Sequence, residues 1–468
     1  MKKLFLILGL SVGLMYACSG PKSGLRADIQ LPADTSAVEV PKASDVFQEP
    51  QLRQLIDTAV RNNPDLLGQI AVLQQARAEL TARKFALLPA VDVFAGTGLR
   101  RFGEYTIDGV GNFDTNFSPN IRPDQRMSNP LPDLLLTARV SWELDIWGRL
   151  RSMRTAAAKR YLASEAGLHW QKTVLASEVA SAFYELKALN EIQRIVSQNA
   201  TLQEAGLALV KIKLEAGRLN ALAVQQFEAQ LARTRSMYHA LEADKLRTLN
   251  QLNFHLGKVQ GVFTDTSTLS TGEIKEINLK AVPASVLRTR PDVVAASMEL
   301  DAAGADVRAI QAAFYPQLIL GPEIGFHSFN PSKWISPASL AWNMVGGITA
   351  PVFAQRRLKA DLAKSRAMQE QAFQNYRRTA IQAYTEIFNG MQQAQQIALQ
   401  ITEKSKEVAS LKEGVKSANE LFAAGYATYL EVVVAQNNVL EAEVELVQLQ
   451  LARQLNTVEL YRALGGGW

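Results

Sequence analysis

Hydrophobic and polar residues alternate without a break from Leu136 to Ile146. Leu, Ala, Val, Trp, Leu and Ile hold the even positions, and Thr, Arg, Ser, Glu and Asp hold the odd ones. A stretch of this length and period two fits a tilted strand that crosses a bilayer. Strands of soluble sheets seldom keep Arg, Glu and Asp together on one face. We therefore predict a membrane-crossing β-strand here.

Weaker alternation predicts three more strands. Val91, Val93 and Ala95 begin a partner strand, so the first hairpin spans about 90–146. A second hairpin, at about 317–352, has one apolar face on each strand: Leu318, Leu320, Ile324 and Phe326 on the first, and Leu340, Trp342, Met344, Ile348 and Val352 on the second. Four strands cannot close a barrel, and an open edge in lipid leaves backbone groups unpaired. Several copies of the chain must therefore pool their strands around a symmetry axis.

Long helices account for most of the remaining chain. A helix is expected over about 51–88 and another over about 283–315, ended by Pro89 and Pro316. Proline-free stretches follow at about 148–216 and 356–424, each long enough for a helix of roughly 100 Å. Gly217 and Gly425 then permit a reversal. Each stretch, with its return helix to Leu256 or Leu464, forms a helical hairpin. The apolar positions spread widely enough for each helix to contact neighbours on two sides, as in the wall of a tube.

The chain repeats itself once. Pro64 recurs 227 residues later as Pro291, whereas Gly217 recurs 208 residues later as Gly425. The 19-residue difference lies in the Gly-, Asn- and Pro-rich segment between Phe102 and Asp133, expected to be an exposed loop. Two copies of one large module follow, a first repeat at 51–257 and a second at 283–464, with a linker at 258–282 and a tail at 465–468.

The N-terminus carries an export signal. Residues 1–17 have a basic start, an apolar stretch too short to span a bilayer, and Ala17 before the only cysteine, Cys18. This arrangement resembles a bacterial lipobox, in which the cysteine becomes acylated and holds the chain on a membrane. The alternative is an ordinary signal peptide with an incidental cysteine. Residues 18–50, rich in Pro, Ser, Asp and Lys, are interpreted as a tether.

Composition excludes several classes of function. The net charge of +5 is too small and too dispersed to predict binding to nucleic acid. Four scattered histidines lack metal-ligand spacing, and we find neither a phosphate-binding loop nor a nucleophile arrangement. We therefore expect no enzyme activity, no cofactor and no metal.

Several motifs together resemble the TolC-like outer-membrane efflux proteins, in particular the lipoprotein (NodT-like) channels that work with RND pumps. The motifs are Cys18 in its lipobox, the duplicated module, Trp142 to Arg149 at the end of the second strand, Arg290 to Val293 at the start of the second repeat, and Tyr461 to Ala463 before the Gly-rich ending at 464–468. The resemblance covers nearly the whole chain.

The resemblance implies an α plus membrane-β fold in a homotrimer. Four strands from each chain would form a 12-stranded barrel in outer-membrane lipid, continuous with a periplasmic α-helical barrel, with an equatorial collar that includes the tether and the linker. It implies a passive exit duct that receives substrates from an inner-membrane RND pump through a periplasmic adaptor. The substrate and the identity of the pump are not encoded in the sequence.

The resemblance also assigns roles to the two hairpin tips. It implies that the adaptor docks on Gly217, Arg218, Leu219 and Leu222 at the first tip, and on Gly425, Tyr426, Thr428 and Leu430 at the second. It further implies an aperture gate at Glu431, with Val434 as an apolar neighbour. The alternatives are that the tips are ordinary helical turns and that Glu431 is a solvated helix residue.

Four aromatic residues are candidates for the girdles at the two edges of the bilayer: Trp142, Trp147, Phe326 and Trp342. Packing at the junction between barrel and helices is the alternative for some of them. Two other classes of protein remain possible from the helices alone, a periplasmic coiled-coil lipoprotein scaffold and a pump adaptor. Neither class explains four alternating strands.

Overall fold

The computed structural model describes residues 46–260, 268–269, 277, 282, 284–351 and 353–466. The signal at 1–17, Cys18 and most of the tether and the linker lie outside the described residues. The chain divides into two compact units. We call Met1–Gln69, Ala166–Val294 and Phe373–Trp468 the helical unit, and Ile70–Glu165 and Ala295–Ala372 the sheet unit. Two long helices run through both.

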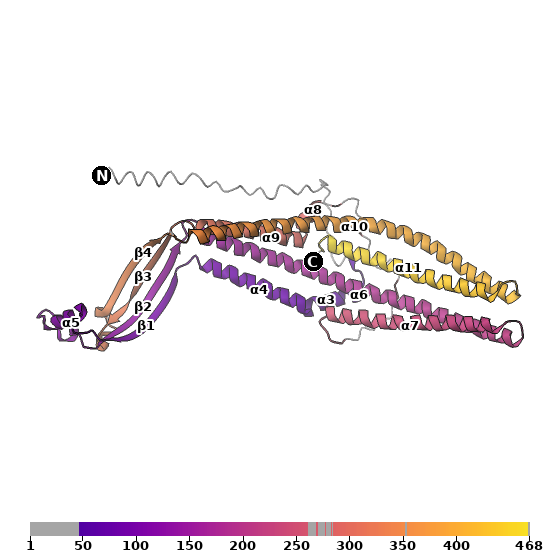
Figure 1. Cartoon of the computed structure of the whole chain (residues 1–468), viewed down its shortest axis with the longest axis horizontal. Helices are drawn as coiled ribbons and strands as arrows, with labels where there is room; N and C mark the ends of the chain where they lie inside the picture. The colour runs from indigo at the N-terminus through magenta and orange to yellow at the C-terminus, as the bar shows by residue number, and fades with distance from the viewer. Residues whose placement is uncertain are drawn as a thin grey trace. The chain divides into compact units, whose positions relative to one another are not determined.

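The sheet unit contains the four expected strands, which confirms the predicted α plus membrane-β class. They are β1 (Ala90–Arg100), β2 (Leu131–Leu144), β3 (Gln317–Ser328) and β4 (Leu340–Thr349). All neighbouring pairs are antiparallel, and the order is β1-β2-β3-β4 (Figure 1). The second hairpin ends at Thr349, and Val352 lies outside the described residues. Among the described residues, β1 and β4 therefore each keep one edge without a partner strand.

The strand register places the apolar positions of all four strands on one face. Val93 lies opposite Ala138, Ala138 opposite Ile324, and Ile324 opposite Trp342. Because side chains opposite each other in a ladder point to the same side, this row defines an apolar face. The next row along, Asp92, Arg139, Glu323 and Asn343, defines a polar face on the other side.

The segment between β1 and β2 is more ordered than we predicted. It contains a helix, α5 (Ile107–Phe117), and a short 3₁₀ turn, η1 (Pro123–Gln125). The Thr106 hydroxyl accepts a hydrogen bond from the Gly109 N–H at 3.0 Å and so caps α5. Ile107, Val110, Phe113 and Phe117 lie at helical spacing and are all exposed. That spacing is typical of a helix, whereas the Gly-, Asn- and Pro-rich composition predicted only an exposed loop.

The first helix of each repeat is broken in two, contrary to the expected single helices. Repeat one has α3 (Pro50–Asn62) and α4 (Pro64–Phe85), and repeat two has α8 (Ala284–Thr289) and α9 (Pro291–Ala312). Pro64 and Pro291 each begin the second piece, where the missing N–H costs nothing. The residue before proline is driven to extended backbone, and this ends the preceding helix. Asn63 accordingly has φ −64° and ψ 123°.

Four long helices form the two hairpins: α6 (Arg149–Glu215) with α7 (Ala221–His255), and α10 (Gln355–Ala424) with α11 (Tyr429–Ala463). Gly217 has φ +69° and Gly425 has φ +87°, values that glycine adopts without strain. The Arg218 N–H donates to the Lys213 carbonyl, and the Tyr426 N–H to the Leu421 carbonyl, both at 2.9 Å. Both long helices therefore end in the same left-handed cap.

The core of the helical unit includes the end of the expected tether. Val46 and Phe47 are buried, and the Phe47 ring meets the Tyr461 ring edge-on at 5.0 Å. The Lys187 ammonium binds the Glu49 carboxylate at 2.8 Å. Residues 46–49, at the end of the expected tether, therefore pack against the helical unit.

The start of α4 is bonded to the end of the return helix of its own repeat. Asn63 is buried, and its side-chain amide donates to the carbonyl of His255, the last residue of α7, at 3.0 Å. The oxygen of the same side-chain amide, Oδ1, accepts from the Leu66 N–H at 3.0 Å. The Glu178 carboxylate lies 3.4 Å from the His255 ring. We call Asn63, Glu178 and His255 the Asn63 clamp.

The second repeat has the equivalent arrangement with charged residues. Arg290 is 1 % exposed and donates to the carbonyl of Ala463, the last residue of α11, at 3.1 Å. It also binds Asp292 through two bonds of 2.8 and 3.0 Å, and Glu386 at 2.7 Å. Its guanidinium lies over the Trp170 ring at 4.7 Å. We call Arg290, Asp292, Glu386 and Ala463 the Arg290 clamp.

Candidate functional site

The polar face of the sheet carries ion pairs between strands. Arg139 on β2 donates through Nε to Glu323 on β3 at 3.0 Å, and its guanidinium lies 5.0 Å from the centre of the Phe94 ring. Nearer the loops, the His327 ring lies 2.7 Å from the Asp133 carboxylate. This face therefore offers fixed charges to whatever lies against it, whereas the opposite face offers hydrocarbon.

Two of the four girdle candidates lie where the strands meet the helices. The Trp142 indole donates to the Leu87 carbonyl at 3.1 Å, just before β1. The Trp147 indole donates to the Pro316 carbonyl at 2.7 Å, just before β3, and stacks on Tyr315 at 4.7 Å. Both tryptophans therefore fasten the junction between strands and helices, which was the alternative weighed for them. Their girdle role stays a prediction.

The other two candidates lie toward the loop end of the sheet. Phe326 is opposite Leu136 on β2, and Trp342 is exposed near the start of β4. Leu136 and Trp142 are separated by six residues of β2, or about 20 Å. A transmembrane barrel has an outward apolar band of about 25 Å. A strand tilt of about 40° shortens this separation to roughly 15 Å across the membrane, and the girdle role of Phe326 and Trp342 stays a prediction.

The described residues contain neither a candidate transmembrane helix nor a candidate metal site. No helix among them combines the length and apolarity that a transmembrane helix needs. Within the same described ranges, no three His, Cys, Asp or Glu side chains gather closely enough to bind a metal ion.

The two hairpin tips share one small hydrophobic core in the helical unit. Val210 and Ala223 come from the first hairpin, and Phe422 and Val432 come from the second. The Lys213 ammonium donates to the Phe422 carbonyl at 3.0 Å and lies 3.9 Å from the centre of the Phe422 ring. The tips therefore form one packed structure within the chain.

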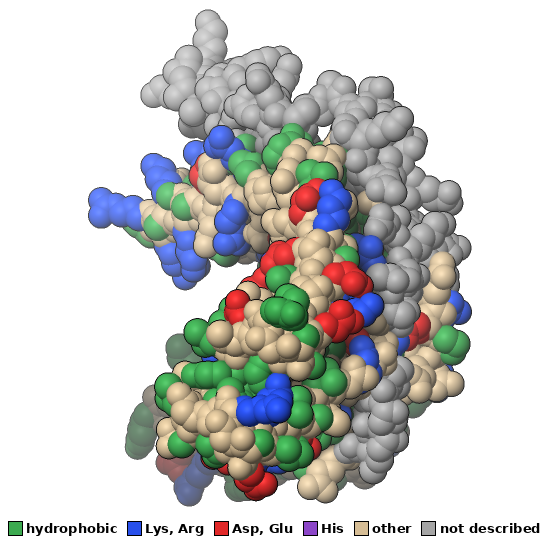
Figure 2. All heavy atoms as spheres, turned by 90° about the vertical axis from the view of Figure 1, so that its right-hand side faces the viewer, with side chains coloured by type: hydrophobic (Ala, Val, Ile, Leu, Met, Phe, Trp, Pro, Cys, Tyr) green, Lys and Arg blue, Asp and Glu red, His purple; other side chains and the backbone are tan. Residues whose placement is uncertain are grey.

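Most of the predicted docking residues are exposed at this end of the hairpins. Gly217, Arg218 and Leu222 are exposed at the first tip, whereas Leu219 is half-buried against the tip core. At the second tip the exposed residues are Gly425, Tyr426, Thr428 and Leu430, together with Glu431 and Val434. Figure 2 looks onto this end and shows hydrophobic side chains interleaved with acidic and basic ones. Their docking role stays a prediction.

Glu431 has a local partner that the sequence argument did not anticipate. Its carboxylate accepts from the Thr428 N–H at 2.5 Å and from the Thr428 hydroxyl at 3.1 Å, which forms a capping box at the start of α11. At the first tip the Asn220 side chain caps α7 by accepting from the Ala223 N–H at 3.2 Å. The acid at the second tip therefore serves helix capping, whatever it does in a gate.

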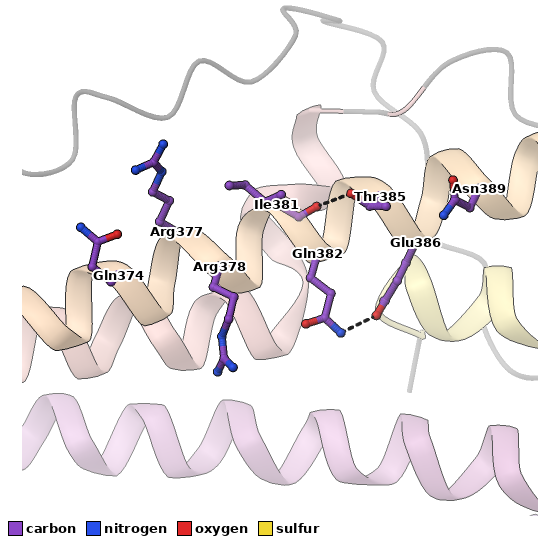
Figure 3. Close-up of a pocket in the computed structure, with 8 residues that line it drawn as sticks. All are labelled: Gln374, Arg377, Arg378, Ile381, Gln382, Thr385, Glu386 and Asn389. Atoms are coloured by element: carbon purple, nitrogen blue, oxygen red, sulfur yellow. Dashed lines mark hydrogen bonds between the residues drawn. The ribbon is translucent and has the colours of Figure 1, made fainter.

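A groove of about 590 Å³ follows one face of α10 in the helical unit. Figure 3 shows Arg377 and Arg378 pointing to different sides of the helix, and Gln382 bonded to Glu386. Glu386 also belongs to the Arg290 clamp, so the clamp contributes one side chain to the lining of the groove. Burial raises the pKa of Asp292 in the clamp, and the charge of Arg290 opposes this effect. This polar face of α10 is open to a partner surface.

The residues of the two clamps stabilise the fold and were not predicted from the sequence. The repeat had already aligned Asn63 with Arg290 and Glu178 with Glu386, through the offsets of 227 and 208. The offset of 208 also aligns His255 with Ala463, whose carbonyls are the two acceptors. The aligned pairs were therefore a usable signal, although neither the side-chain types nor their spacing predicts the contact.

Comparison with known proteins agrees with this architecture. The family described as outer membrane efflux protein matches residues 55–258 and 282–466, one segment in each repeat. The pyoverdine export outer membrane protein OpmQ of Pseudomonas putida is 30 % identical over 470 residues, which cover 99 % of this chain and 97 % of that protein. The cation efflux system protein CusC of Escherichia coli O6:H1 is 28 % identical over 423 residues, covering 90 % and 87 %.

Solved structures show the same fold. A crystal structure of CusC, described in terms of folding and transmembrane channel formation, superposes with a TM-score of 0.83 at 26 % identity, covering 93 % of this chain and 97 % of that one. The family match spans both repeats, and the structural match spans both the sheet and the helical hairpins. The chain belongs to the outer membrane efflux protein family.

Proposed function

We propose that the protein is the passive exit duct of a tripartite efflux pump, in which three copies form one channel. The observation that carries this proposal is the sheet itself, with an apolar face, a charged face and two edges without partners. Pairing β1 of one copy with β4 of the next satisfies both edges, and three copies of four strands give twelve. The apolar faces then contact outer-membrane lipid, and the polar faces line the pore.

The helical hairpins complete the duct. Helices of about 100 Å are long enough to carry the tunnel from the membrane through the periplasm. The tips at Gly217 and Gly425 receive a periplasmic adaptor, which connects the duct to an inner-membrane RND transporter. The polar groove on α10 contacts the neighbouring copy, and acylation of Cys18 anchors each chain. The resemblance to lipoprotein channels supports these assignments.

Relatives of similar identity are named for unlike cargoes, since CusC is a cation efflux protein and OpmQ exports pyoverdine. We therefore assign most of the choice among substrates to the transporter. A periplasmic scaffold without channel activity is the competing function. A scaffold function does not explain why one face of the sheet is charged and the other apolar.

One experiment separates the two functions. The full-length protein is extracted from outer membranes, cross-linked in detergent and inserted into planar bilayers. A cross-linked trimer with discrete conductance steps supports the channel. A monomer that inserts no pores contradicts it and favours the scaffold. Deletion of the protein, followed by susceptibility measurements across metal ions, dyes and drugs, then identifies the cargo class.

A further inference from the structure

One row of the sheet brings three charged residues together on its polar face. Asp92 on β1 lies opposite Arg139 on β2, Arg139 lies opposite Glu323 on β3, and Glu323 lies opposite Asn343 on β4. Opposite residues share a face and a level, so these four side chains form one continuous polar line across the sheet. We call these four residues the polar belt.

The two rows next to the polar belt contain no charged residue. Toward the loops, Phe94, Thr137, Gly325 and Ala341 stand in register. Toward the helices, Ala90 lies opposite Ser141 on one side of the sheet, and Gly321 lies opposite Val345 on the other. The other charged residues on this face, Arg100, Asp133 and Glu143, lie at least two rows from the belt. Since neighbouring rows on one face are about 7 Å apart, the belt is a separate line of charge.

The contacts within the belt leave it with a net negative charge. Arg139 is paired with Glu323 at 3.0 Å and is held over the Phe94 ring. Asp92 has no ion-pair partner in the described ranges of the chain. One arginine, one aspartate and one glutamate give a net charge of −1 per copy. The ring of three copies that the proposed function requires would carry −3.

We propose that the polar belt is a charge filter inside the barrel, which favours cationic cargo over anionic cargo. The inference rests on the proposed channel, because only a closed barrel makes the row a ring. Rings of charged side chains select ions in cation and anion pores, and low-dielectric walls concentrate their field. The positive charge of Arg139 reduces the preference for cations. The net charge of Asp92, Arg139 and Glu323 together therefore sets how strong that preference is.

Cysteine chemistry at Asn343 measures the potential at the belt itself. Asn343→Cys is introduced into the full chain, in which Cys18 is the only native cysteine. Two thiosulfonate reagents of similar size, one cationic and one anionic, are applied to the channel in proteoliposomes, with the unsubstituted chain as background. We expect the cationic reagent to react faster. Removing one nearby negative charge should lower the ratio of the two rates by about threefold.

Charge variants then test each member of the belt. Glu323→Gln should reduce the rate ratio toward one, and Glu323→Gln combined with Asp92→Asn should invert it, since only Arg139 remains charged. Arg139→Gln should raise it. Glu104→Gln, which removes the same charge from the loop beyond β1, is the matched control and should leave the ratio unchanged.

Reversal potentials in a KCl gradient measure the cation-to-anion selectivity of the whole pore. We expect the variants to rank by selectivity in the same order as by rate ratio. Rate ratios that do not differ between these variants in conducting channels overturn the filter and leave the channel intact. A wild-type protein that inserts without conducting contradicts the proposed function itself, and the filter with it. Far-UV circular dichroism of each variant confirms that it has folded.

Discussion

The Asn63 clamp and the Arg290 clamp hold equivalent places in the two repeats, yet the donor is a neutral amide in one and a guanidinium within an ionic cluster in the other. Both donate a side-chain N–H to the carbonyl of the last residue of a return helix, His255 or Ala463. The last carbonyls of a helix lack partners within the helix and lie at the negative end of its dipole. A donor is therefore what the position requires, and an amide or a guanidinium supplies it.

The difference between the clamps lies in what surrounds the donor. Arg290 brings a buried charge, and Asp292 and Glu386 surround it with carboxylates. A buried ion pair gains little over a neutral replacement, but the loss of one partner leaves a charge stranded. The second clamp is therefore the more fragile of the two, although it has more contacts.

Breaking the Arg290 clamp should have the largest effect. Arg290→Ala leaves Asp292 and Glu386 facing each other without a cation and removes the donor for the Ala463 carbonyl. We expect a loss of about 3–5 kcal/mol of stability, because breaking a buried ion pair strands its partners. Thermal unfolding followed by far-UV circular dichroism measures it. Arg288→Ala, on the exposed side of α8, is the control, and equal losses in the two variants would show that the clamp does not stabilise the fold.

Replacement by alanine should cost more stability at Gly257, two residues after His255 of the Asn63 clamp, than at Gly217 in the first hairpin tip. Gly257 and Gly217 have φ values of +67° and +69°, so alanine strains both equally, by about 1–2 kcal/mol. A Cβ at Gly257 would lie 2.3 Å from the Asn62 carbonyl oxygen, whereas nothing lies within 4 Å of one at Gly217. We expect Gly257→Ala to cost about 1–3 kcal/mol more, as overpacking does. The same melting experiment compares the two, and similar losses would refute the crowding.

Breaking the Asn63 clamp should cost less stability than breaking the Arg290 clamp. Asn63→Ala removes the bond to the His255 carbonyl and the cap on the Leu66 N–H, with no charge left behind. We expect a loss of about 1–3 kcal/mol, the cost of leaving buried polar groups unsatisfied. The variant Asn63→Asp separates the two bonds, because it keeps an acceptor for the Leu66 N–H and loses the donor to the His255 carbonyl. A loss for Asn63→Ala as large as that for Arg290→Ala would refute the ranking.

The sequence was informative where periodicity and proline act locally. The alternation from Leu136 to Ile146 predicted β2 and its two faces, and Gly217 and Gly425 marked both turns. Prediction from the sequence failed where one residue has opposite effects on the segments before and after it. Pro64 ends one helix and begins another, because it restrains Asn63 while fitting the first turn of α4. A proline read only as a place where a helix stops, as Pro89 was, does not reveal that second role.

The functional surfaces depended on register, which no single strand encodes. Asp92, Arg139, Glu323 and Asn343 are spread over 252 residues, and only the pairing of four strands aligns them. The tips show the opposite case, because Glu431 was identified from its position alone. The bond that it makes to Thr428 depends on a side-chain rotamer that position does not fix. Its proposed gate function and its cap function therefore need separate tests.

Glu431 offers the smallest but most discriminating effect, because two substitutions separate its functions. Glu431→Ala removes both the charge and the capping box, and should destabilise the start of α11 by about 0.5–2 kcal/mol, the cost of losing a cap. Glu431→Gln keeps an acceptor for the Thr428 N–H and removes only the charge, so melting should be nearly unchanged. If the carboxylates also hold the aperture closed, both variants should raise single-channel conductance in planar bilayers. Raised conductance in Glu431→Ala alone would mean that loosening the tip opens the pore. The first tip, capped by Asn220 with Ala223 in place of the acid, would then differ from the second only in how its helix begins.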